Sequence, residues 1–365
     1  MKNTVRFISS IHHIGADTWQ ALSNTDNPFL RFEFLAALED CQCIDSPTQT
    51  PSLNSGWIPN YAILENYESE SHELESETKI LAIAPIFKKL HSYGEYVFDW
   101  GWAEAYERHN LPYYPKLVWA IPFTPSTGPR IISQGSPEQL ALYHQHIAEG
   151  LTEYCQNNQF SGWHCLFPDS LGTESLAKKN PNKKIMPRIS CQFHWFNNEG
   201  FNNDGSNSRF KDFSHYLEKF TSRKRKNIKK ERSKLIESGF VFNKKSGDEI
   251  TPADIKNFYH CYQLTYVKRN MRGYLTLEFF QQILQTMPDQ LLLVQAQHPA
   301  ENGGKTVANA LYFKDADNLY GRYWGCLEEF DSLHFECCYY QGIEYCIEHN
   351  ISHFDPGTQG EHKIS

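Results

Sequence analysis

Apolar residues near the N-terminus recur at the spacing of a helix. Leu30, Phe34, Leu35 and Leu38 follow an i, i+4, i+5, i+8 pattern after Asn27-Pro28, a pair typical of a helix start. Runs rich in β-branched and aromatic residues predict strands over residues 61–67, 80–87, 93–102 and 116–123. A helix over residues 137–158 and a strand over 163–167 complete this half of the chain.

The second half repeats this order of elements. Residues 274–283 share the pattern of residues 29–38, and they precede predicted strands over 291–297, 306–313 and 318–325. A helix over 334–349 and a last strand over 352–355 follow. One matching helix could arise by chance, but the shared order favours duplication. We therefore predict an α/β protein of two related domains, residues 1–208 and 209–365, each with a mixed central sheet and flanking helices.

A strongly basic segment joins the halves. Phe213, Leu217, Phe220, Ile228 and Leu235 fall on one narrow arc, which predicts a single long helix over residues 210–238. The other faces of this helix carry the basic residues Arg223, Lys224, Arg225, Lys226, Lys229, Lys230, Arg232 and Lys234. These charges either form a solvated face or bind phosphates, and Lys224 and Glu231 project onto the apolar arc, where a charge needs a partner.

Composition narrows the class of protein. A length of 365 residues fits two domains, and a net charge of −8 argues against a protein that coats nucleic acid. The sequence has neither a bilayer-length apolar run nor a signal peptide, so we predict a cytoplasmic location with the ten cysteines reduced. The pairs Cys41/Cys43 and Cys337/Cys338 lack the spacing of zinc knuckles, so we predict no metal. Motifs of serine hydrolases, P-loop NTPases and dinucleotide-binding domains are missing.

Several blocks carry a family resemblance. Residues 221–239 resemble the basic helix of Fem-type peptidoglycan bridge-forming aminoacyltransferases. From residue 27 onward the chain is more specifically similar to the bacterial FemAB-like family, described as predicted N-acyltransferases of peptidoglycan biosynthesis or recognition. The similar blocks are residues 27–31, 91–100, 113–117, 122–125, 128–130, 192–195, 320–325, 333–336, 339–342 and 359–363. Family members continue past the last block, so we expect a truncated or short C-terminus here.

The resemblance implies two tandem GNAT-like (acyl-CoA N-acyltransferase-like) domains and an enzyme that transfers an acyl or aminoacyl group to an amine on a peptide or cell-wall precursor. In GNAT domains the reacting carbonyl lies where two parallel strands splay apart, here residues 319–324 and 352–355. Acetyl-CoA users bind pyrophosphate with a glycine-rich loop, whereas residues 326–331 are acidic and lack glycine, which disfavours acyl-CoA. Fem-type enzymes use aminoacyl-tRNA, a partner suited to the basic helix.

Three classes of function remain. The first is the transferase, with no tightly bound cofactor, a donor that is either aminoacyl-tRNA or acyl-CoA, and peripheral contact with a lipid-linked precursor. The second is a non-catalytic module that recognises a peptidoglycan precursor. The third, a nucleic-acid-binding protein, depends on the basic helix alone and is opposed by the net acidity.

Transfer to an amine needs a base and donors for the oxyanion. Polar residues within the aromatic blocks are the candidates, although each of them could simply be a structural hydrogen-bonding residue. Glu95 and Asp99 would share one face of a strand over 93–102. The catalytic candidates are His91, Glu95, Asp99, His334, Glu336, Glu361 and His362, and the substrate-binding candidates are Arg130, Arg223, Lys224, Arg225, Lys226, Arg322, Tyr323, Trp324 and Gln359.

Overall fold

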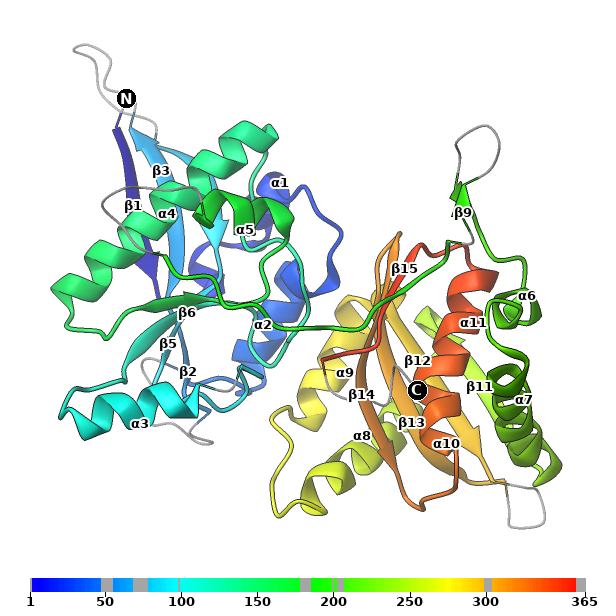
Figure 1. Ribbon diagram of the computed structural model, residues 1–365. Coiled ribbons are helices and arrows are strands. Elements are labelled where there is room, and N and C mark those ends of the chain that lie inside the picture. Colours follow the sequence, from blue (N-terminus) through cyan, green and yellow to red (C-terminus); the bar gives the residue numbers. More distant parts are fainter. Residues whose placement is uncertain are drawn as a thin grey trace. The chain divides into compact units, whose positions relative to one another are not determined.

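The chain folds into two compact units, Met1–Ser190 and Cys191–Ser365 (Figure 1). This computed structural model describes residues 2–46, 55–67, 78–97, 99–177, 185–198, 200–201, 207–298 and 304–358. The mixed α/β class predicted from the sequence is confirmed. The boundary differs from the predicted one after residue 208, because the short strand β8 (Trp195–Phe196) pairs with β15 (His353–Asp355) of the second unit.

Two sheets form the first unit. Strand β3 (Tyr61–Tyr67) lies between β1 (Lys2–Ile8) and β4 (Thr78–Ala84), and both neighbours are antiparallel to it. The second sheet has the order β2 (Trp57–Pro59), β5 (Ile86–Lys89), β6 (Lys116–Trp119) and β7 (Trp163–Cys165). The predicted strand 80–87 is divided between the sheets at Pro85, which has no N–H for a ladder. Strands β6 and β7 are parallel.

Two helices of the first unit follow the predicted apolar pattern. Asn27 accepts a hydrogen bond from the N–H of Phe29 and caps the 3-10 helix Pro28–Leu30, which leads into α2 (Phe32–Asp40). Helix α4 (Pro137–Asn157) begins with a capping box and lies along β1 and β3 (Figure 1). Its Ile147 and Leu151 are fully buried. The shorter helices are Ile11–His13, α1 (Ala16–Leu22) and α5 (Ser170–Ala177).

The predicted strand over residues 93–102 is wrong. Residues 93–97 form a turn and irregular backbone, and a helix, α3 (Trp100–Arg108), follows. Gly94 and Tyr96 both have positive φ values, +79° and +58°, which interrupt an extended strand. None of the residues of α3 is buried, so the aromatic side chains read as strand core lie largely at the surface.

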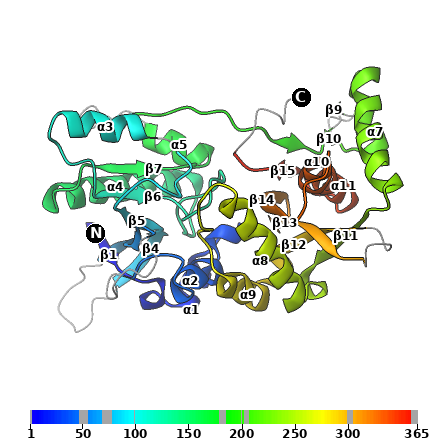
Figure 2. The same ribbon diagram turned by 90° about the horizontal axis from the view of Figure 1, so that it is seen from below.

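A single six-stranded sheet organises the second unit. Its order is β11 (Val241–Ser246), β12 (Leu291–Gln297), β13 (Thr306–Lys314), β14 (Asn318–Cys326), β15 and β8, and only β14 and β15 are parallel. Helices α8 (Pro252–Val267) and α9 (Leu277–Thr286) cover one face (Figure 2). The other face carries α10 (Leu333–Phe335), a π-helical turn (Glu336–Tyr340) and α11 (Gln341–Glu348). The remaining short elements are β9 (Gly200–Phe201), β10 (Asn207–Ser208), Gly247–Glu249 and Pro288–Gln290.

The basic segment is two helices, α6 (Phe213–Leu217) and α7 (Ser222–Glu237), rather than the predicted single helix. Thr221 starts α7 because its side chain accepts a hydrogen bond from the N–H of Lys224. The predicted apolar face is correct, since Phe213, Leu217, Ile228 and Leu235 are buried. No helix in the described ranges has the length and apolarity needed to cross a membrane.

Both units use the same order of elements. Each begins with a strand and two helices, continues with antiparallel strands, and ends with a helix and a parallel strand. This order spans β1 to β7 in the first unit and β11 to β15 in the second. They differ in the sheets, because the strands of the first unit are divided between two, and in one connection. Residues 315–317 join β13 to β14, whereas residues 90–115, here called the insertion, join β5 to β6. The insertion contains α3.

Candidate functional site

In the second unit, a parallel strand pair comes apart at mid-sheet. Residues Asn318, Leu319 and Tyr320 of β14 pair with His353, Phe354 and Asp355 of β15. Strand β15 then ends, while β14 continues to Cys326. These are the two strands named in the sequence analysis as a splayed pair. Past this point no described strand pairs with the edge of β14 that faces β15. Backbone groups outside a ladder are the kind that can hold a ligand.

The first residues beyond the parallel pairing are Gly321 and Arg322. A Cβ atom on Gly321 would lie 3.3 Å from Cα of Pro356, so a glycine lets the turn after β15 approach closely. Tyr323 pairs with Leu311 and Gly321 with Tyr312, which leaves Arg322 as the extra residue of a β-bulge. Bulges redirect a side chain and are common next to active sites. Arg322 is half-buried, and its guanidinium can bind a carboxylate or a phosphate.

Trp324 and His334 lie beside each other on the face that carries α10. Their ring centres are 5.4 Å apart, and the ring of Tyr339 lies 5.5 Å from that of His334. His334 is half-buried, so its imidazole is not sealed from solvent. It is therefore a catalytic candidate whose ring packs directly on a side chain of β14.

Tyr323 points to the opposite face of the sheet. Its ring packs against Tyr262 at 5.5 Å and Phe280 at 5.6 Å, on the side covered by α8 and α9. Only 7% of Tyr323 is exposed. The guanidinium of Arg322 lies 5.3 Å from the centre of this ring, whereas Trp324 packs on His334. The three consecutive substrate-binding candidates are thus divided, and Tyr323 contributes to the core.

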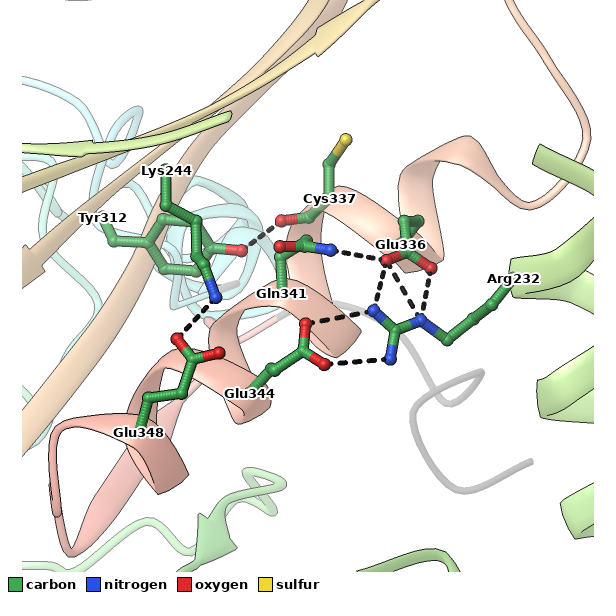
Figure 3. A network of polar contacts seen from close by, with 8 residues as sticks. All are labelled: Arg232, Lys244, Tyr312, Glu336, Cys337, Gln341, Glu344 and Glu348. Carbon is green, nitrogen blue, oxygen red and sulfur yellow. Dashed lines mark hydrogen bonds and ion pairs between the residues drawn. The ribbon is translucent and has the colours of Figure 1, made fainter. Parts of the chain in front are cut away.

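Glu336 belongs to a buried ion network that ties α7 to the helix after β14 (Figure 3). Arg232 donates to the Glu336 carboxylate from Nε and Nη2 at 3.0 and 2.9 Å, and Gln341 donates from Nε2 at 2.7 Å. Nη1 and Nη2 of the same guanidinium donate to Glu344 at 3.3 and 3.1 Å. Glu336 is 2% exposed and starts a π-helical turn. Its carboxylate is engaged as an ion-pair partner, which favours a structural role.

The remaining charges of α7 differ in their surroundings. Glu231, predicted to project onto the apolar arc, accepts a hydrogen bond from the hydroxyl of Tyr340 at 2.7 Å. Lys224 and Arg225 are half-buried, and Arg223 and Lys226 are exposed. These four cations occupy the first turn of α7, where the helix dipole adds positive potential. This end of the helix is suited to an anionic partner.

In the first unit, a buried lysine brings Glu95 and Asp99 together. Lys116, the first residue of β6, donates from Nζ to Asp99 Oδ2 at 2.6 Å, to Glu95 Oε2 at 2.9 Å and to Ser92 Oγ at 3.0 Å. The hydroxyl of Tyr113 donates to the same Asp99 oxygen at 2.7 Å. Glu95 and Asp99 are therefore neighbours as predicted, but through a shared ammonium group and not through one face of a strand.

Burial and the neighbouring charges shift the pKa values of this cluster in opposite directions. Burial raises the pKa of Glu95 despite the nearby Lys116. Burial alone would also raise the pKa of Asp99, but hydrogen bonds from Lys116 and Tyr113 outweigh it and lower that pKa. Burial lowers the pKa of Lys89 to about 7, against the attraction of Glu95. The ammonium of Lys89 also lies 4.0 Å from the centre of the Trp57 ring.

His164 completes the cluster from β7. Burial lowers the pKa of His164 to about 4, with a further contribution from the charge of Lys116. Among the described residues, ligand atoms of Glu95, Asp99 and His164 lie within 4.8 Å of one another, a spacing that could hold a metal ion. The Nζ atom of Lys116 already lies 3.5 Å from His164 Nδ1 and closer to both carboxylates. A metal ion would have to displace this ammonium, so the donor set fits Lys116 better.

Two of the remaining candidates have surroundings that the described residues show. The guanidinium of Arg130 is buried and donates to the carbonyl oxygens of Ser126, Gly128, Pro129 and Leu166, which favours a role in holding that loop. His91 is half-buried, and its ring covers Gly56. Gln359, Glu361 and His362 lie outside the described residues.

Sequence reasoning missed Lys89, Lys116 and His164. The available signal was Lys116, which directly precedes the apolar run of residues 117–121. A charge at the head of a fully buried strand needs a partner, and that partner is supplied by the insertion.

Comparisons with known proteins give one family and a shared fold. A sequence profile of FemAB-like proteins, described as peptidoglycan biosynthesis/recognition, matches residues 10–365. No curated protein matches the chain. A conserved protein of unknown function from Bacteroides thetaiotaomicron VPI-5482 is 12% identical, with 99% of this chain and 94% of that chain covered and a TM-score of 0.50. It shows the same fold.

Two further solved structures are similar to a lower degree. FemX is 11% identical, with 98% of this chain and 89% of that chain covered and a TM-score of 0.47. L-PGS from Bacillus licheniformis is 9% identical, with 78% of this chain and 70% of that chain covered and a TM-score of 0.43.

Proposed function

The chain belongs to the FemAB-like family, and on this premise we propose that it is an N-acyltransferase that joins an acyl or aminoacyl group to an amine on a peptide or cell-wall precursor. The family match spans residues 10–365 and so includes both compact units. We place the reaction in the cytoplasm, where aminoacyl-tRNA and acyl-CoA, the two classes of donor, are made. The protein would contact a lipid-linked precursor peripherally.

We further propose that each unit is a version of the GNAT fold. The shared order of elements supports this, because in both units antiparallel strands lead to a strand that is followed by a helix and a parallel partner. The second unit has the longer extension of one parallel strand beyond the other. We therefore assign the acyl-transfer chemistry to the second unit.

The observation that carries the proposal is the end of the β14–β15 pairing at Tyr320 and Asp355, followed by the bulge at Arg322. In the proposed reaction the donor carbonyl lies against the edge of β14 beyond its pairing with β15, and the N–H groups there stabilise the oxyanion. Arg322 binds a carboxylate or phosphate of a substrate. The half-buried His334, next to Trp324, takes the proton from the amine.

The bonds balance for an aminoacyl-tRNA donor. The amine nitrogen attacks the ester carbonyl, an amide bond forms and the ester C–O bond breaks. The proton taken by His334 then passes to the leaving ribose oxygen. We favour this donor over acyl-CoA because residues 326–331 carry Glu328, Glu329 and Asp331 and no glycine. The basic first turn of α7 supplies a complementary surface for tRNA phosphates.

A non-catalytic recognition module is the second candidate function. One observation favours it, since Glu95, Asp99 and Glu336, three of the predicted catalytic carboxylates, are engaged in buried ion pairs. Such a protein would bind the precursor without needing a donor.

A donor-dependence assay separates the two functions. The full chain is incubated with a lipid-linked muropeptide and with either a charged tRNA mixture or acyl-CoA, and mass spectrometry detects a new amide. A transferase yields the amide with one donor class and loses it when Arg322 is changed to Ala. Retention of unmodified muropeptide with every donor would instead identify a recognition protein.

A further inference from the structure

The insertion, residues 90–115, forms a groove at the surface of the first unit. Its volume is about 680 Å³, within the range of small-molecule sites. Its lining is more apolar than polar and combines aromatic and aliphatic side chains with two carboxylates and one amide: Trp100, Ala103, Glu104, Glu107, Asn110, Leu111, Pro112, Tyr113 and Tyr114. All of them belong to the insertion, the segment that replaces the short connection 315–317 of the second unit.

Helix α3, which forms one wall of the groove, does not fold around a core of its own. None of its residues is buried, and Trp100 and Trp102 are 41% and 50% exposed. Nearby Tyr93 and Leu111 are 51% and 57% exposed. Contiguous exposed aromatic surface of this kind is a feature of interaction sites.

The buried ion cluster fixes the position of this groove. Ser92, Glu95 and Asp99 belong to the insertion, and all three accept hydrogen bonds from Lys116 of β6. Tyr113 and Tyr114, which line the groove, bond to Asp99 and Ser92 at 2.7 Å each. These bonds tie Tyr113, Tyr114 and the residue that precedes α3 to the sheet. A site whose side chains are already held in place loses less entropy when it binds a ligand.

We propose that this groove binds a carbohydrate chain. A sugar ring presents a C–H face that stacks on aromatic rings and a rim of hydroxyl groups that bond to carboxylates and amides. Trp100, which is 41% exposed, and the half-buried Tyr114 supply the rings, and Glu107 and Asn110 supply the polar partners. This combination matches an uncharged, hydroxyl-rich ligand.

The charges of α3 argue against other occupants. Its charged residues are Glu104, Glu107 and Arg108, a net negative set, whereas helices that lie on membranes or bind nucleic acid carry an excess of Lys and Arg. Glu104 already pairs with Arg108 at 3.2 Å, so a cationic peptide would meet little uncompensated charge. The proposal also stands apart from the transfer reaction, because sugar binding needs no donor.

The test is a titration of the full chain with an N-acetylglucosamine tetrasaccharide, in which isothermal titration calorimetry measures the dissociation constant. Trp100→Ala should weaken binding at least about tenfold, the size expected for loss of a central aromatic anchor. Trp102→Ala is the matched control, because Trp102 lies on the same exposed helix but does not line the groove, and it should bind like the wild type. Glu107→Gln should keep the fold and weaken binding to a smaller degree.

Three results would overturn the proposal. The first is absence of tetrasaccharide binding by the wild type. The second is equal loss in the Trp100→Ala and Trp102→Ala variants. The third is that the wild type binds phospholipid vesicles or a lysine-rich peptide, that Trp100→Ala abolishes this binding, and that the tetrasaccharide does not compete with it. Because no donor is present, each result is independent of the amide-formation assay.

Discussion

The ammonium of Lys116 lies 2.6 Å from Oδ2 of Asp99, and both side chains are 1% exposed. The pair joins the first residue of β6 to the residue that precedes α3. Removal of one member of a buried ion pair leaves an uncompensated charge, which costs much more than an exposed pair contributes. This relationship gives the first prediction.

Lys116→Met should destabilise the first unit by about 3–5 kcal/mol, because Glu95 and Asp99 would remain buried without their cation. Thermal unfolding followed by circular dichroism measures the effect. Lys79→Met is the control, since Lys79 is an exposed lysine on β4 of the same unit. Equal melting temperatures for the two variants would show that the Lys116 cluster does not hold the unit together.

Lys89 should make the stability of the first unit depend on pH. Burial lowers its pKa to about 7, so between pH 7 and 10 the unfolded chain binds more protons than the folded one. Stability should therefore rise with pH across this window, by roughly 1–3 kcal/mol between pH 7 and 9. Lys89→Met should remove this rise. Parallel pH profiles of wild type and variant would contradict the assignment.

On helix α7, two basic residues should differ sharply in their contribution to stability. Arg232→Met leaves Glu336 buried beside Gln341 alone and should cost about 3–5 kcal/mol. Lys234→Met removes an exposed pair with Asp331, whose side chains are 59% and 74% exposed, and should cost at most about 1 kcal/mol. Chemical unfolding of both variants measures the difference. Similar midpoints would refute the structural role given to Arg232.

The first turn of α7 should determine retention of tRNA. Simultaneous change of Arg223, Lys224, Arg225 and Lys226 to Gln should abolish retention of charged tRNA in a filter-binding assay and flatten its salt dependence. A matched control changes the exposed residues Lys256, Arg269, Arg272 and Lys305 of the same unit to Gln and so removes the same number of charges. Unchanged retention after the α7 changes would count against tRNA as the donor.

His334 should control the pH dependence of the transfer reaction. His334→Ala should lower kcat by roughly 10²- to 10⁴-fold and remove the rise of rate with pH that accompanies loss of a proton from the imidazole. His260→Ala, at an exposed position on α8, serves as control. Full activity with an unchanged pH profile in His334→Ala would assign the base elsewhere.

Much of the secondary structure was predictable from local patterns. Strand β12 has the bounds predicted for it, residues 291–297, and α4 lies within one residue of the predicted helix. A period of two or of 3.6 reflects which face of an element is buried, and that information is contained in neighbouring residues. The aromatic block at 93–102 led to a wrong strand prediction, because a segment with exposed aromatic residues has the same composition as a buried strand.

The sequence by itself determined the family, the apolar faces of the predicted helices and most of the predicted strands, but it indicated neither α3 nor α8. Only the tertiary structure decided which charges meet, because Lys116 and Glu95, or Arg232 and Glu336, come together through chain folding between residues far apart in sequence. It also decided that Arg322 is the extra residue of a bulge, since that depends on the register of β14 against β13. Periodicity encodes burial, whereas charge pairing and register depend on partners that no local pattern contains.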